Sequence, residues 1–118
     1  MLREIHDVMQ DDASSVRRWF HDDYFDLFVW QADGEVTLFE LCYGPHSSER
    51  ALVWDRQHGF FHDGPAAQQA WIARFDEVAA ALPEDIRRDI GPRIREFAYR
   101  KPEVATRRRR FRRHAWQR

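Results

Sequence analysis

The sequence predicts an α+β domain in which an antiparallel β-meander of four to five strands is covered on one face by two C-terminal helices. Two patterns lead to this fold class. Residues 16–62 hold short aromatic and β-branched runs that alternate every two positions and are separated by turn residues. After residue 63, apolar residues instead recur every three or four positions, as in amphipathic helices. With 118 residues, 43% of them apolar, the chain can form one core, which we assign to residues 1–100, followed by a basic arm at 101–118.

The first third of the chain carries the earliest strand signals. Residues 1–10 are open between a short helix and an edge strand. Residues 16–20 are a candidate short strand. Residues 24–31, YFDLFVWQ, predict a central strand because both faces of such a strand would be largely apolar. One face would carry Phe25, Leu27 and Val29, and the other Tyr24, Asp26, Phe28 and Trp30.

Turn signals join the following strands into a meander. Asp33 and Gly34 lie between two apolar runs and predict a hairpin that leads into a strand at 35–43. A loop at 44–49 leads to a strand at 50–55. A turn that ends at Gly59 then leads to a short strand at 60–62.

Two helices are predicted after the strands. Pro65 suits the first position of a helix whose apolar stripe continues to residue 82, and Pro83 ends that helix. Glu84 opens a second helix, whose stripe runs to residue 97. Gly91 and Pro92 predict a kink or a break in it, and the preserved phase of the stripe favours a kink.

The pattern RRWF…YFDLFVW…FELCY…RALVW, within residues 16–62, resembles a family of small uncharacterised bacterial proteins. The resemblance implies a shared fold. It attaches no activity to the chain, so it assigns no catalytic residue.

The charge of the chain is strongly divided. Residues 107–118, RRRRFRRHAWQR, contain seven arginines and no acidic side chain, whereas residues 1–106 contain twelve basic and twenty acidic side chains. Arginine binds phosphate through two parallel hydrogen bonds, and aromatic rings stack on unpaired bases. The arm therefore predicts contact with a nucleic acid, RNA or single-stranded DNA, or with another polyanion. The residues predicted to bind are Arg107, Arg108, Arg109, Arg110, Phe111, Arg112, Arg113 and Trp116.

Other roles for the arm follow from the same charges. It could dock on the acidic body of its own subunit, clasp a neighbouring subunit, or serve solubility alone. The first two would make the chain a structural or interaction protein. We predict a non-enzymatic binding module, because the sequence contains neither a GxSxG nucleophile motif nor a phosphate-binding glycine loop. A third hypothesis is a small metal-dependent enzyme that uses His58, His62 and nearby aspartates.

Composition limits cofactors and location. The single cysteine, Cys42, lies in an apolar run and is expected to be a buried thiol, which suits a reducing, cytoplasmic setting. No apolar stretch approaches the roughly 20 residues that span a membrane. No cofactor is predicted. His58, His62 and Asp63 are weak candidates for a metal site, because they offer nitrogen and oxygen ligands at a spacing that matches no known signature.

The aromatic strands predict apolar side chains on both faces of the sheet, and both faces must then be buried. Trp19, Trp30, Trp54 and Trp71 are all predicted to be core residues. Two helices cover only one face of the sheet, so the other needs the N-terminal segment, the arm aromatics or a second chain, and a homodimer is one expectation. Asp26 on that other face needs a partner, for which Arg17, Arg18 and Arg50 are candidates.

Overall fold

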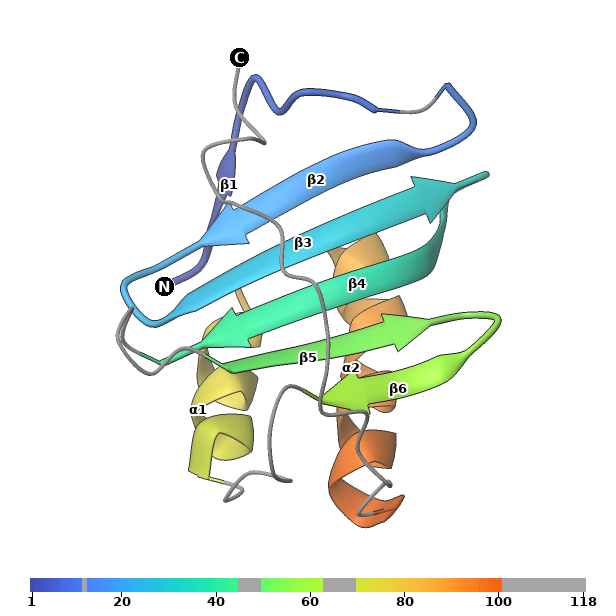
Figure 1. The fold of residues 1–118 in the computed structure, drawn as a ribbon. Coiled ribbons are helices and arrows are strands. Elements are labelled where there is room, and N and C mark those ends of the chain that lie inside the picture. Colours follow the sequence, from blue (N-terminus) through green and yellow to red (C-terminus); the bar gives the residue numbers. More distant parts are fainter. Residues whose placement is uncertain (12, 45–49, 63–69, 101–118) are drawn as a thin grey trace.

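The computed structural model describes residues 1–11, 13–44, 50–62 and 70–100. Six strands form one antiparallel sheet in the order β1-β2-β3-β4-β5-β6, so every strand pairs with its neighbour in sequence (Figure 1). The meander and the α+β class are thus confirmed, with more strands than the four to five expected. The strands are β1 (Arg3–Ile5), β2 (Val16–His21), β3 (Phe25–Ala32), β4 (Glu35–Tyr43), β5 (Arg50–Asp55) and β6 (Gly59–His62).

The additional strand is β1, from the segment that the sequence left open between helix and strand. It pairs with β2, where Arg3 lies opposite His21 and Ile5 opposite Trp19. Leu2 packs into the core on the helix side of the sheet, whereas Ile5 packs on the other side. Residues three apart fall on opposite faces of a strand but on one face of a helix. Because Leu2 and Ile5 are packed on opposite sides of the sheet, the segment is a strand.

The β3–β4 hairpin turns where Asp-Gly predicted it. Asp33 has φ 53° and Gly34 has φ 78°, and Ala32 pairs with Glu35. Two central residues with positive φ characterise the type I′ turn, whose twist matches that of the flanking strands. A register shift between Trp30 and Gln31 marks a bulge just before this turn.

Both helices lie on the same face of the sheet (Figure 1). α1 spans Ala70–Ala79, and α2 spans Glu84–Arg100. The expected start of the first helix at Pro65 lies outside the described residues. α2 continues through Pro92 without a break, and Asp89 fastens it to β4 by accepting a hydrogen bond from the Val36 backbone N–H at 3.0 Å. None of the described helices is long and apolar enough to cross a membrane.

The main core lies between the sheet and the helices. Phe75 of α1 meets Phe25 edge to face at 5.4 Å, and Trp71 stacks on Tyr43 at 4.5 Å between ring centroids. The four tryptophans expected in the core are at most 9% exposed, as predicted. The predicted faces of β3 are also confirmed, except at Tyr24. That residue precedes the strand and packs beside Phe25 on the helix side.

Candidate functional site

The arm residues predicted to bind an anionic partner, 107–113 and Trp116, lie outside the described residues. Within the described ranges, the chemically distinctive region is the sheet face away from the helices, which we call the second face. Its side chains are Trp19, Asp26, Phe28, Trp30, Glu40, Cys42 and Ala51, and all are buried. They belong to alternating positions of β2, β3, β4 and β5, so the pleat of the sheet places them together.

Asp26 is the polar centre of the β3 part of the second face. Its Oδ1 accepts a hydrogen bond from Trp19 Nε1 at 2.7 Å and lies 2.8 Å from His21 Nδ1. The β2–β3 register places His21 directly opposite Asp26 and so builds this cluster. Asp26 is 1% exposed, whereas His21 is 33% exposed and reaches solvent. The Trp19 indole N–H therefore helps to offset the cost of burying the carboxylate, and His21 adds a second donor in the tautomer that carries its proton on Nδ1.

Glu40 places a second carboxylate on the next strand. It pairs with Phe28 in the β3–β4 register, while Cys42 pairs with Asp26. Asp26 and Glu40 are thus diagonal neighbours, a relation that separates Cα atoms by about 7–8 Å. Glu40 is 0% exposed, and its Oε2 lies 3.5 Å from Cys42 Sγ. Cys42 is the buried thiol that the sequence predicted.

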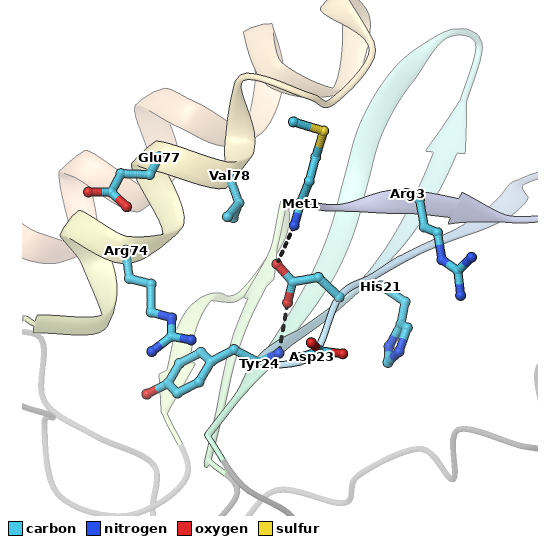
Figure 2. A pocket seen from close by; sticks show the side chains of 9 residues that line it. Met1, Arg3, His21, Asp23, Tyr24, Arg74, Glu77 and Val78 are labelled. Carbon is cyan, nitrogen blue, oxygen red and sulfur yellow. Dashed lines mark hydrogen bonds and ion pairs between the residues drawn. The ribbon is translucent and has the colours of Figure 1, made fainter.

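A polar pocket of about 600 Å³ opens beside this cluster, between the β2–β3 turn and α1 (Figure 2). Asp22 closes the turn by accepting hydrogen bonds from the backbone N–H groups of Tyr24 at 2.8 Å and Phe25 at 2.7 Å. The Arg74 guanidinium lies over the Tyr24 ring, 3.9 Å from its centroid. The pocket lining carries both signs of charge in equal measure, from Arg3, Arg74 and the Met1 amine against Asp22, Asp23 and Glu77. This balance gives it no clear preference for a charged ligand.

The two histidines of the weak metal candidate lie in different environments. His62 is 1% exposed, bonds to the Tyr43 hydroxyl through Nε2 at 2.5 Å, and stacks on Phe97. His58 is exposed in the β5–β6 turn, with Nδ1 3.3 Å from Asp55 Oδ2. Asp63 lies outside the described residues. In the part of the chain that the structure describes, no group of three or more potential ligands gathers around a point.

Asp55 stabilises the β5–β6 turn through contacts with Gln57 and His58. Partial burial would raise the pKa of Asp55, but hydrogen bonds from the Gln57 backbone and from His58 outweigh it and hold the pKa below its ordinary value. His58 therefore has a structural partner in the β5–β6 turn.

Six arginines of the described body form ion pairs with carboxylates. Arg18 bonds to Glu4 at 2.8 and 2.9 Å, and this hydrogen bond raises the pKa of Arg18. Arg18 also lies 3.5 Å from Asp85, whose pKa is held below its ordinary value chiefly by a hydrogen bond from the Gln31 amide. Arg17 reaches the Met9 carbonyl and Asp11. Further pairs are Arg56–Glu35, Arg87–Glu84, Arg88–Asp89 and Arg93–Glu96.

Sequence reasoning found Asp26 but missed two of its partners. It considered only arginines, whereas Trp19 and His21 supply the ring N–H groups described above. Arg18 lies toward the helix side of the sheet, where it meets Asp85. The register of the β2–β3 hairpin carried the missing signal, because counting back from the turn places His21 opposite Asp26.

Comparisons with protein-family models, with curated proteins and with solved structures found no significant match to this chain.

Proposed function

We propose that this protein is a small, non-enzymatic binding module whose arginine-rich arm contacts an anionic partner, with RNA or single-stranded DNA as the favoured class. The observation that carries the proposal is the division of charge between arm and body. Residues 1–100 hold eleven basic and nineteen acidic side chains, while residues 101–118 hold eight basic and one acidic. An acidic body repels phosphate, so attraction to a polyanion falls to the arm.

The pairing of the body's arginines supports this assignment. Six arginines of the described body form ion pairs with nearby carboxylates. An arginine that is paired with a carboxylate loses that interaction when it binds phosphate. The loss is about 0–1 kcal/mol for an exposed pair and larger for the more buried Arg17 and Arg18. The arm has a single acidic residue, Glu103, so its arginines have little such competition within the arm.

The composition of the arm favours unpaired nucleotides over duplex. Phe111 and Trp116 interleave with the arginines. Stacking of a base on an aromatic side chain contributes about 1–3 kcal/mol, and it requires a base that is free of its own stack. As part of the same proposal, the protein acts in a reducing, cytoplasmic setting, which suits its one buried cysteine.

The test is binding of a labelled single-stranded RNA across salt concentrations. If six or seven arginines engage phosphate, log K should fall against log salt with a slope of about −4 to −5, from roughly 0.7 per contact. The comparison protein is a full-length variant in which Arg107, Arg108, Arg109, Arg110, Arg112 and Arg113 are changed to glutamine, the arm-neutral variant.

The arm-neutral variant should lose most of the affinity and nearly all of the salt dependence. A matched variant with lysine at the same six positions keeps the charge but loses the planar, bidentate group, so it should keep the slope and bind more weakly. Equal binding by the natural chain and the arm-neutral variant would refute the proposed function. A shorter chain that ends at Thr106 provides a further comparison.

A further inference from the structure

The second face presents negative charge within an apolar surface. Asp26 and Glu40 lie on the central strands β3 and β4, and they are 1% and 0% exposed. Trp19, Phe28 and Trp30 lie on the same face and belong to its apolar cluster. A segment that suits this surface must offer cationic groups with good hydrogen-bonding geometry together with apolar side chains.

The described elements leave much of the second face without a covering layer. Both helices lie on the opposite side of the sheet (Figure 1). The N-terminal segment contributes Val8 to the apolar cluster of the second face, and Ile5 packs against that cluster. Within the described ranges, no helix or strand lies over Phe28, Glu40 and Ala51 on this side. Each of these three side chains is 0% exposed, so their burial calls for a further layer above β3, β4 and β5.

The arm has the chemistry and the reach to provide that layer. Phe97, near the end of α2, packs on Phe60 and His62 of β6, so the chain leaves the helix at the β6 edge of the sheet. The 18 residues from 101 to 118 can extend about 60 Å at roughly 3.3 Å per residue. The longest dimension of the fold is 34 Å, so the arm can pass around this edge and cross the sheet.

We propose that the second face is the docking surface for residues 101–118 of the same chain. Arginine side chains of the arm face Asp26 and Glu40, and Phe111 and Trp116 pack on the aromatic side chains. This inference goes beyond the proposed function, because it concerns where the arm lies without a partner and holds whatever that partner is. An arginine cannot serve a carboxylate and a phosphate together, so docking and partner binding compete.

The reactivity of the Cys42 thiol tests the docking directly. Cys42 is the only cysteine of the chain, lies on the second face beside Glu40, and is 2% exposed. The measurement is the rate at which a disulfide reagent labels Cys42 in the full-length protein, in the arm-neutral variant and in the matched lysine variant. Far-UV circular dichroism verifies that each variant keeps the fold.

Docking predicts that the arm-neutral variant is labelled at least about tenfold faster than the natural chain, which corresponds to ~1.4 kcal/mol. The lysine variant should stay nearer to the natural rate, and a free peptide of residues 101–118 should slow the labelling of the arm-neutral variant. Equal rates in the natural and arm-neutral chains would overturn the proposal. Protection that increases with protein concentration would also overturn it, because a second copy of the chain would then cover the face.

Inorganic polyphosphate gives an independent test on the natural chain if the arm-neutral variant does not fold. It should compete for the arm and accelerate the labelling of Cys42, and an unchanged rate would count against docking. The variant comparison uses no RNA. If RNA does not bind but the arm still slows the labelling of Cys42, the proposed function alone would be rejected. RNA binding without arm-dependent protection would reject the docking alone.

Discussion

Replacing Asp26 with alanine tests the cluster that organises the second face. The change removes the acceptor of Trp19 Nε1 and of His21 Nδ1. A hydrogen bond to a charged group contributes about 1.5–3 kcal/mol. The bond from the buried Trp19 should count in full, whereas His21 is a third exposed and can turn to water.

We therefore expect Asp26→Ala to lower the free energy of unfolding by about 2–4 kcal/mol. For a domain of this size, that loss corresponds to a fall in Tm of roughly 10–20 °C. Asp26→Asn keeps a carbonyl oxygen for the indole N–H and loses only the charge, so it should cost about 1 kcal/mol.

The assay is urea unfolding followed by far-UV circular dichroism, with Asp23→Ala as the matched control. Asp23 is exposed in the adjacent turn, so its substitution should change stability by less than about 0.5 kcal/mol. The reasoning is refuted if Asp26→Ala costs no more than Asp23→Ala. It is also refuted if asparagine costs as much as alanine, because the acceptor geometry would then be irrelevant.

Three further results are expected. Phe75→Ala should lower the free energy of unfolding by about 3–5 kcal/mol, because the ring is 1% exposed and meets Phe25; a loss below about 1 kcal/mol in urea unfolding would mean that α1 is not fixed to the sheet. The pKa of Asp85 is lowered in the folded state, so its contribution to stability is complete above its ordinary pKa of 3.8 and is lost as the pH falls below that value. Acid unfolding should therefore be less steep for Asp85→Asn, and an unchanged acid transition would contradict this. Glu40→Gln should raise the affinity for single-stranded RNA by weakening arm docking, and reduced affinity in the titration would contradict the competition.

The strands and helices were predictable where local signals agree. The strands at 35–43 and 50–55 have the bounds that their alternation predicted, and the turn at Asp33 and Gly34 follows from its dipeptide. The segment at 1–10 was not decided, because three paired residues give too short a period to separate a strand from a helix. Packing determines that this segment is a strand, because Leu2 and Ile5 pack on opposite faces of the sheet.

The candidate site was harder to predict than the fold. Cys42 and Glu40 could be placed together because residues two apart share a face of a strand. The partners of Asp26 come from a different strand, and their identity depends on the register that the turn at Asp22 sets. The choice of arginine as the expected partner rested on charge alone, and it left out neutral N–H donors such as the Trp19 indole.

The lengths of the outer strands bear on how copies of this protein can meet. β1 has three residues and β6 has four, while the central strands β3 and β4 have eight and nine. A strand at the border of a sheet exposes a row of unpaired backbone N–H and C=O groups that can recruit a strand from another molecule. Because both borders here are short, two copies joined in a continuous sheet would share few ladder hydrogen bonds. The meander thus resists growth by strand addition.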